Sequence, residues 1–257
     1  RPPIPATAIR RGSAMRIPNA VSTIVLLLAG YACAGAAHAQ EMRAAPLVPP
    51  FSAAKAGKPP PPWDTVKIND RKTPTTYEIV QNSSESVLHA IADSSASALG
   101  VPVSFDVKAA PVLVWRWRVA ALIDEADNTV AAKEDSPARI VLEFDGDKSK
   151  LSFSDRAASG FAKQLGGRDL PYATLMYIWS NTAPVGTVIP NPHAKRIQMV
   201  VASSGPAGVG KWQSLKRNVY DDYKRAFNEE PGLLKSVGVM TDTDNTGTKV
   251  EAWYGDL

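Results

Sequence analysis

The chain has 257 residues, of which 44% are hydrophobic and 21% charged, with a formal net charge of +4. Four basic residues and no acidic residue lie before Gln40, so the rest of the chain carries 25 basic and 25 acidic residues. A neutral chain lacks the basic surface on which nucleic-acid binding depends, which excludes that class of partner. Cys33 is the single cysteine, so the chain can form no internal disulfide.

A secretory signal peptide is predicted for residues 15–39. It has a short basic start, an apolar run (residues 21–36) and the small-x-small cleavage sequence Ala37-His38-Ala39. The apolar run is too short to span a membrane, so no stable span is expected after cleavage. These features predict a periplasmic or secreted protein, and residues 1–14 are interpreted as an over-extended start.

The remaining chain divides into a linker and one domain. Residues 40–62 are rich in Pro and Ala, which predicts an extended tether. Residues 63–257 are predicted to form a single domain, because about 200 residues suffice for one hydrophobic core.

Short alternating runs bounded by turn residues dominate this domain and predict strands. The predicted strands are 75–80, 86–92, 95–103, 112–119, 139–146, 173–180, 196–203, 236–242 and 249–255. Two helical patterns interrupt them, at 154–165 and 218–232; in the second, Asn218 is a good N-cap and Pro231 ends the helix. The order lacks regular βαβ units, so we expect a mainly β fold: a two-sheet antiparallel β-sandwich with two short helices.

The run VLVWRWRV, residues 112–119, alternates strictly between two faces. Trp115 and Trp117 share one face with other apolar residues, whereas Arg116 and Arg118 lie on the other. Neighbouring strands need a common apolar face, so the two tryptophans are predicted to be core.

The polar faces of several strands suggest a binding surface. In the strand at 196–203 the apolar, inward set would be Ile197, Met199 and Val201. If neighbouring strands align their polar faces, one open sheet surface collects Arg116, Arg118, Glu143, Asp145 and Arg196. The surface is then either a solvated sheet of cross-strand ion pairs or a groove for a polar ligand. Trp179, Trp212 and Trp253 are further candidates as exposed aromatic residues in ligand binding.

The segment DTDNTGT, residues 242–248, gathers oxygen-bearing side chains. Counted as an EF-hand loop from Asp242, its twelfth position is Trp253 and not Glu, which excludes that motif. Two compatible interpretations remain open. The segment is a tight hairpin turn, or Asp242, Asp244 and Asn245 hold a structural Ca²⁺ with help from Asp256 or Asp155.

No catalytic residue is predicted. Residues 205–212 have the spacing of a phosphate-binding loop, but Trp212 stands where Ser or Thr must bind magnesium, so a Gly-rich turn is expected there. The chain also lacks the H-E-x-x-H and G-x-S-x-G sequences of zinc proteases and α/β-hydrolases.

Several segments together, among them PVLVWRWRV, LPYATLMYIW and MTDTDNTGTKVEAWYGDL, resemble a bacterial family of exported proteins catalogued as a domain of unknown function. The resemblance implies an export signal and one domain, and it implies no activity. The order of elements is also similar to galactose-binding-type jelly rolls, which occur in many carbohydrate-binding modules and often carry calcium.

Three functions are consistent with these patterns. The first is a non-catalytic module that binds carbohydrate or another polar ligand of the cell envelope. The second is an envelope polysaccharide hydrolase that uses Asp or Glu, and the third is a structural or assembly protein of the periplasm.

Overall fold

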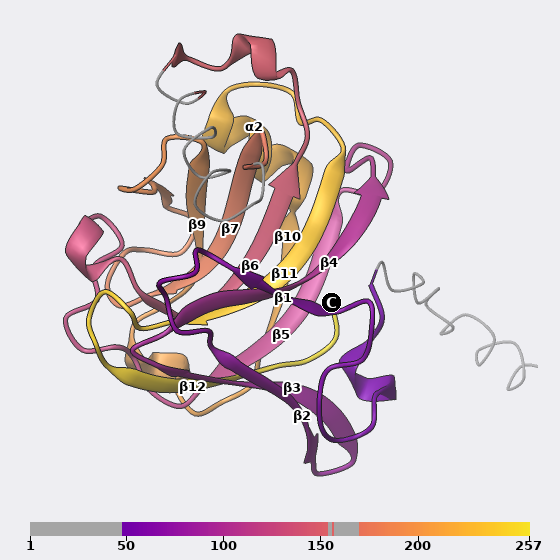
Figure 1. The fold of residues 1–257 in the computed structure, drawn as a ribbon, viewed down its shortest axis with the longest axis vertical. Helices are drawn as coiled ribbons and strands as arrows, with labels where there is room; N and C mark the ends of the chain where they lie inside the picture. Colours follow the sequence, from indigo (N-terminus) through magenta and orange to yellow (C-terminus); the bar gives the residue numbers. More distant parts are fainter. Residues whose placement is uncertain (1–47, 154–155, 157–169) are drawn as a thin grey trace, which may run out of the picture. The chain divides into compact units, whose positions relative to one another are not determined.

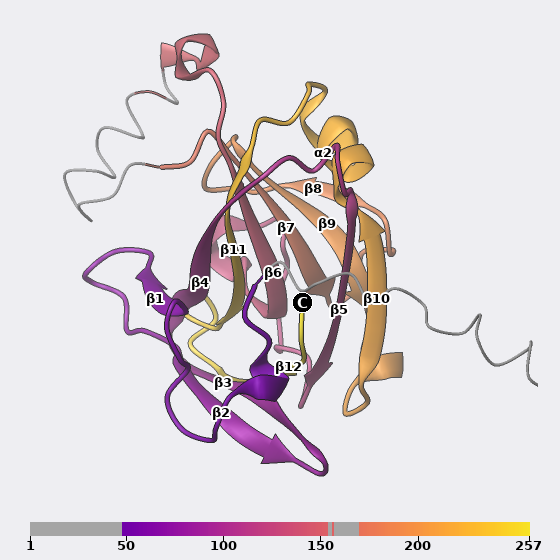
Figure 2. The same cartoon turned by 90° about the vertical axis from the view of Figure 1, so that its right-hand side faces the viewer.

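The computed structural model describes residues 48–153, 156 and 170–257. Within this part of the chain, twelve strands form a seven-stranded and a five-stranded sheet (Figure 1). The two sheets form separate layers (Figure 2), and their facing sides share one apolar core. The fold is therefore a β-sandwich, as predicted, and the finer likeness to a galactose-binding jelly roll stays a prediction.

The seven-stranded sheet contains, in spatial order, β1 (Asp64–Lys67), β4 (Ala96–Phe105), β11 (Leu234–Asp242), β6 (Ser136–Phe144), β7 (Ala173–Ser180), β9 (Ile197–Ser204) and β8 (Val188–Pro190). The five-stranded sheet contains β10 (Gln213–Asn218), β5 (Val112–Val119), β12 (Lys249–Tyr254), β3 (Glu85–Asp93) and β2 (Thr76–Asn82). Neighbouring strands of these two sheets are antiparallel, except that β7 and β9 are parallel. Four 3₁₀ turns complete the described elements: η1 (Phe51–Ala53), η2 (Ala131–Lys133), η3 (Lys148–Lys150) and η4 (Pro206–Gly208).

Aromatic side chains fill the space between the inner faces of the sheets. Trp115 and Trp117 of β5 are 2% and 0% exposed, which confirms the prediction that both are core. The Trp115 ring lies 5.0 Å from Tyr177, and the Trp117 ring lies 6.2 Å from Trp179, both on β7 of the opposite sheet. Large aromatic areas buried in this way dominate the stability of a core.

The alternation of β9 is opposite to the predicted one. Val200 and Ala202 belong to the main core, whereas Met199 and Val201 join Ile189 in a separate apolar cluster. Side chains on both faces of β9 are buried, so apolar alternation along this strand does not identify its inner face.

The α-helix α2 (Val219–Phe227) follows β10 directly and lies at one end of the sandwich (Figure 2). The Asn218 side chain accepts a hydrogen bond from the backbone N–H of Asp221 at 3.1 Å, which confirms the predicted N-cap. The helix ends at Phe227, ahead of Pro231, because Asn228 adopts a left-handed conformation with φ of 54°. The other predicted helix, at 154–165, lies outside the described residues apart from residue 156.

The folded unit begins before Trp63, earlier than composition predicts. Val48 and Phe51, within the segment expected to be a tether, are 3% and 1% exposed and belong to the main core. The Phe51 ring lies 4.7 Å from Trp63, and the Ser52 backbone N–H donates to Asp256 Oδ1 at 2.9 Å. A Pro-rich segment with two apolar anchors therefore packs on the sandwich. The predicted signal peptide, residues 15–39, lies outside the described residues.

Within the described ranges, no helix combines the length and the apolar character that crossing a bilayer would require.

Candidate functional site

A groove crosses the outer face of the seven-stranded sheet, where two neighbouring strands carry glycine. Gly100 of β4 is paired with Gly238 of β11. A Cβ atom on Gly100 would lie 3.2 Å from Val66 Cγ2, and one on Gly238 would lie 2.9 Å from the Leu99 carbonyl oxygen. A Cβ atom at either position would crowd its neighbours, so the two glycines permit close packing of the strands here, and Gly100 also lines the groove.

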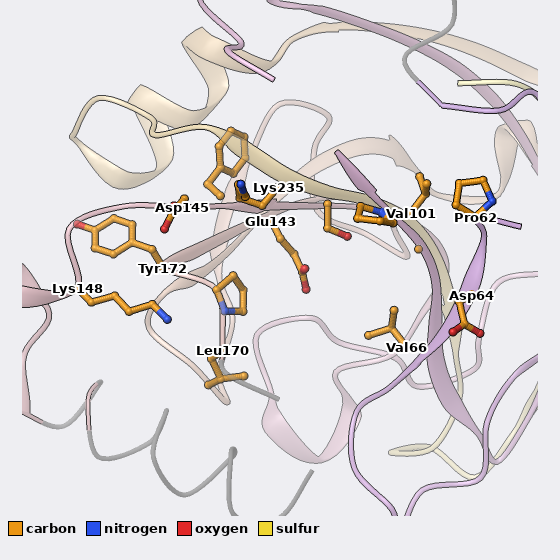
Figure 3. Close-up of a pocket in the computed structure, with 15 residues that line it drawn as sticks. Pro62, Asp64, Val66, Val101, Glu143, Asp145, Lys148, Leu170, Tyr172 and Lys235 are labelled. Atoms are coloured by element: carbon orange, nitrogen blue, oxygen red, sulfur yellow. The ribbon is translucent and has the colours of Figure 1, made fainter. Parts of the chain in front are cut away.

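The first cavity of the groove has a volume of about 400 Å³. Glu143 of β6 points into it, and Asp64 and Val66 of β1 lie across the cavity from Glu143 (Figure 3). Its other lining residues are Pro62, Gly100, Val101, Pro102, Phe144, Asp145, Lys148, Leu170, Pro171, Tyr172, Lys235 and Ser236. Acidic, basic and apolar groups thus converge on one space.

A second cavity, of about 210 Å³, adjoins the first. The two share Val66, Glu143, Leu170 and Pro171. The second is more apolar, since its further lining includes Ile68, Ala98, Val141, Met176, Ile197 and Met240. The groove therefore changes along its length from a charged end to an apolar end, with Glu143 between them.

Three of the predicted binding residues line this groove. Glu143 and Asp145 line the first cavity, and Arg196 lines the second. The Arg196 guanidinium is already engaged, because it donates to the Tyr172 carbonyl at 3.0 Å and to Glu229 Oε1 at 2.5 Å. Of the predicted binding residues, Glu143 and Asp145 are thus the two that line the first cavity.

Arg116 and Arg118 lie elsewhere, so the prediction that all the polar strand faces share one surface is wrong. Both arginines are on β5, which belongs to the five-stranded sheet, whereas Glu143 is on β6 of the seven-stranded sheet. The outer faces of a sandwich point away from each other, so side chains on them cannot meet. Alternation assigns a side chain to a face of its strand but does not assign the strand to a sheet.

The prediction that Trp179 is an exposed ligand-binding residue is also wrong. Trp179 is 0% exposed, lies between the sheets, and its indole N–H donates to the Gly205 carbonyl at 3.1 Å. It faces inward because the alternation of β7 places it on the same side as Leu175 and Tyr177. Trp179 is a core residue, whereas Trp212 and Trp253 are half-buried on the outer face of the five-stranded sheet.

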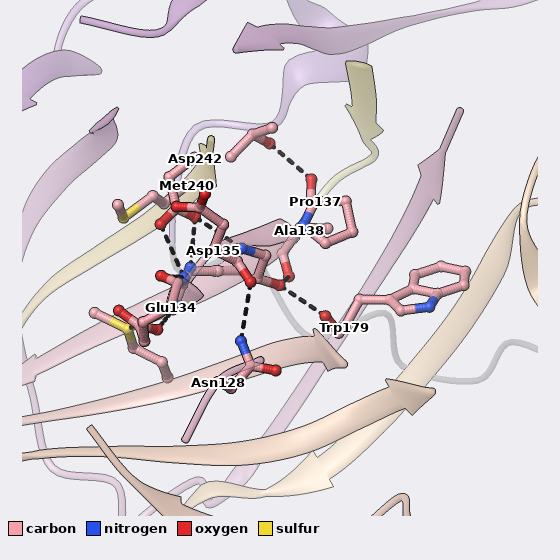
Figure 4. Close-up of polar contacts among 12 residues, drawn as sticks. Asn128, Glu134, Asp135, Pro137, Ala138, Trp179, Met240 and Asp242 are labelled. Atoms are coloured by element: carbon pink, nitrogen blue, oxygen red, sulfur yellow. Dashed lines mark hydrogen bonds and ion pairs between the residues drawn. The ribbon is translucent and has the colours of Figure 1, made fainter. Parts of the chain in front are cut away.

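The oxygen-rich segment at 242–248 is a turn that links β11 of the seven-stranded sheet to β12 of the five-stranded sheet. These two strands are not paired with each other, so the prediction of a tight hairpin is wrong. The charges of the segment are already balanced by basic side chains. Arg139 donates from Nε and Nη2 to the two oxygens of Asp242 at 2.7 and 2.8 Å, and Lys72 contacts Asp244. Asn245 donates through Nδ2 to Asp135 at 3.2 Å. Glu134, Asp135 and Asp242 are drawn together in Figure 4.

At this turn a cation would compete with Arg139 and Lys72 for the carboxylate oxygens. Carboxylate oxygens of Asp135, Asp242 and Asp244 lie within 4.8 Å of one another. Burial and the nearby Glu134 carboxylate raise the pKa of Asp242 to about 7, against the attraction of Arg139. Arg139, only 1% exposed, occupies the position of the counter-charge. Calcium binding here therefore stays a prediction, and it requires Lys72 to leave Asp244.

Asp256 cannot complete such a site. It follows Tyr254, at the end of β12 opposite to the turn, and its carboxylate accepts hydrogen bonds from Ser52. A strand of six residues separates the two ends by roughly 20 Å. Asp155, the alternative fourth ligand, lies outside the described residues.

Several residues that line the groove were not predicted from the sequence patterns. Asp64 and Val66 belong to a four-residue edge strand that was too short to predict. Tyr172 and Lys235 lie at strand ends, and Lys148 begins η3. Gly100, in the middle of a strong strand pattern, was the available signal, because a strand glycine often marks a close approach or an open space.

Fold and groove together define a β-sandwich protein with a mixed polar and apolar groove on the outer face of its larger sheet. The chain belongs to the family described as "Protein of unknown function (DUF3047)", whose model matches residues 61–257. The family membership confirms the resemblance found in the sequence. No curated protein matches the chain.

Two solved structures illustrate the overall similarity. One is the endoglucanase 3 of Trichoderma harzianum from family GH12, with 10% identity over 77% of this chain and 97% of that chain, and a TM-score of 0.34. The other is the cellulose induced protein Cip1, with 14% identity over 76% of this chain and 88% of that chain, and a TM-score of 0.30. At these TM-scores the similarity says nothing about activity.

Proposed function

We propose that residues 61–257 form an exported binding module, and that its groove binds a carbohydrate or a similar polyhydroxylated ligand of the cell envelope. One observation carries the proposal: a cavity of about 400 Å³ in which carboxylates and lysines converge between apolar walls. Pockets that are largely apolar with a few convergent polar groups are the usual form of a small-ligand site.

The lining matches the chemistry of a sugar. Asp64, Glu143 and Asp145 offer carboxylate oxygens that accept hydrogen bonds from hydroxyl groups, and Lys148 and Lys235 offer donors. Val66 and Pro171 can pack against the C–H faces of a pyranose ring. The charged groups of both signs favour a neutral ligand over a strongly charged one.

The domain is proposed to act outside the cytoplasm. The signal peptide predicted at residues 15–39 would deliver the domain to the periplasm or the exterior, where envelope glycans occur.

Calorimetric titration of the folded domain with cellotetraose, chitotetraose and maltotetraose tests the proposal. We expect saturable binding of at least one of them. Glu143→Gln should weaken that binding by about tenfold, which corresponds to the loss of one charged hydrogen bond. Ser236→Trp should abolish it, because the indole would fill the cavity that Ser236 lines.

Asp124→Asn is the matched control, since Asp124 is exposed and lines neither cavity. It should bind like the unaltered protein. The proposal fails if none of the three glycans binds, or if Ser236→Trp binds as well as Asp124→Asn.

A second function has one observation in its favour. Three carboxylates, those of Asp64, Glu143 and Asp145, line the same cavity, and glycoside hydrolases act through a pair of carboxylates. Release of reducing ends from the glycan that binds, lost in Glu143→Gln, would identify the module as a hydrolase. Binding without release would identify it as a non-catalytic module.

A further inference from the structure

A row of side chains crosses the outer face of the five-stranded sheet, on the opposite side of the sandwich from the groove. Glu78 of β2 pairs with His89 of β3, His89 with Trp253 of β12, and Trp253 with Arg118 of β5. Trp212 stands next, because Gln213 pairs with Trp117 and the antiparallel register places Trp212 beside Arg118. The row therefore crosses four strands and ends at the residue that precedes β10.

The aromatic rings of this row and the Arg118 guanidinium stack on one another. The His89 and Trp253 rings are parallel within 2°, with centroids 4.8 Å apart. The Arg118 guanidinium carbon lies 4.1 Å from the centroid of Trp253 and 5.5 Å from that of Trp212. Arg118 is thus held between two indoles, in the geometry of a double cation–π contact.

Arg118 differs from the other partly buried arginines in its lack of a carboxylate. Arg116 pairs with Glu85 at 2.5 Å, Arg196 with Glu229, and Arg217 with Asp222. Within the described part of the chain, Arg118 forms no ion pair, and its buried Nε has no hydrogen-bond partner. Within the protein, the contacts that stabilise its positive charge are with the faces of the two indoles.

This stacking preorganises Arg118 to bind an anion. Stacking holds the guanidinium plane in place before a ligand arrives, so less rotamer entropy is lost on binding. The terminal Nη groups present the parallel donors that a carboxylate accepts in bidentate fashion. The indole edges on both sides offer apolar contact to the carbon skeleton that bears the carboxylate.

The surrounding charges select a single negative charge. Arg116 is neutralised by Glu85, and two further carboxylates, Glu78 and Glu251, contact His89 at 3.3 and 2.9 Å. These glutamates repel a doubly charged phosphate more strongly than a single carboxylate, and one carboxylate matches the charge of the one guanidinium without an ion pair. We propose that Arg118, between Trp212 and Trp253, binds the carboxylate of an acidic sugar, a uronic acid residue of a polysaccharide. This site is separate from the groove.

NMR of the indole N–H groups of Trp212 and Trp253, assigned with Trp→Phe variants, tests the proposal. Titration with digalacturonate should shift both signals saturably, and neutral galactobiose should shift neither. Arg118→Gln should abolish the response. Arg118→Lys retains the charge but loses the planar fork, and should weaken binding by about tenfold.

Arg225→Gln serves as the matched control, because it removes an exposed arginine on α2 and should leave the titration unchanged. Glu143→Gln should also leave it unchanged, so failure at this site and failure at the groove give different results. If Arg118→Gln does not fold, Arg118→Lys alone decides. The proposal is overturned if digalacturonate leaves both indoles unshifted, or if inorganic phosphate or the peptide acetyl-Ala-Ala binds more tightly.

Discussion

On the outer face of the seven-stranded sheet Arg139 is 1% exposed and donates to Glu134 at 2.6 Å as well as to Asp242, whereas on the outer face of the five-stranded sheet Arg118 is half-buried between two indoles. Both residues come from the outward positions of strong strands. The difference lies in what covers them. Arg139 lies beneath the segment around Glu134 and the turn at 242–248, and a buried charge must be paired and hydrogen-bonded.

Arg118 is partly exposed to solvent and needs no carboxylate. Its charge is partly solvated and partly balanced by indole faces, at a gain of about 0.5–1 kcal/mol per exposed cation–π contact. Outward alternation alone therefore does not determine the role of an arginine. The covering loops make Arg139 structural, and their absence leaves Arg118 available to a ligand.

The largest expected effect is at Arg139. Arg139→Met leaves the carboxylates of Glu134 and Asp242 buried without their partner, and should lower the free energy of unfolding by about 3–5 kcal/mol. Urea denaturation measures the loss. The triple variant with Glu134→Leu and Asp242→Leu should recover most of it, and a loss below about 1 kcal/mol in the single variant would show that burial does not demand the pairing.

Substitutions at adjacent positions on β5 should differ greatly in how much they lower the free energy of unfolding. Trp117→Ala removes a side chain that is 0% exposed and donates to Ser203 Oγ at 3.1 Å, and should cost about 3–5 kcal/mol. Arg118→Ala, on the outer face, should cost about 1 kcal/mol or less. Thermal and urea unfolding of the two variants compare them directly, and equal losses would contradict the orientation of β5.

A smaller, pH-dependent effect is expected at the end of the sandwich covered by α2. Burial raises the pKa of Glu229, but hydrogen bonds from Arg196, Tyr172 and Tyr223 outweigh it and hold the pKa below its ordinary value. The stability that this carboxylate contributes is therefore complete above the unfolded pKa, near 4.3, and is lost as the pH falls through the lower folded pKa.

Glu229→Gln should accordingly destabilise the domain at pH 7 by about 1–2 kcal/mol, and the difference from the unaltered protein should shrink below about pH 4. Urea unfolding at a series of pH values measures it, with Asp124→Asn as the exposed control. A difference that stays constant with pH would rule out the ionised carboxylate as its source.

The smallest effect concerns calcium at the turn between β11 and β12. Because Arg139 and Lys72 already engage the carboxylates, Ca²⁺ should stabilise the domain by less than about 1 kcal/mol relative to chelator. Lys72→Ala releases Asp244, so the calcium-dependent shift in melting temperature should be larger in this variant. A large shift in the unaltered protein would instead show that the cation displaces Lys72.

Much of the fold could be predicted from local patterns. The nine predicted strands are all present, and β5 and β7 have the predicted boundaries. The three strands that were missed, β1, β8 and β10, are all at sheet edges. Edge strands are short or polar, because one side of the ladder faces solvent, and they carry weak apolar alternation. The groove depends in part on β1, which explains why sequence patterns did not reveal it.

Local alternation along the chain determined the class of fold, the burial of Trp115 and Trp117, and the outward direction of Arg116, Arg118 and Glu143, because side chains of a strand alternate with a period of two. Tertiary structure alone decided which sheet each strand joined and what covered it. Those choices depend on contacts between residues far apart in the chain. They buried Trp179 and Arg139, opened a groove beside Gly100, and placed Arg118 between the indoles of Trp212 and Trp253.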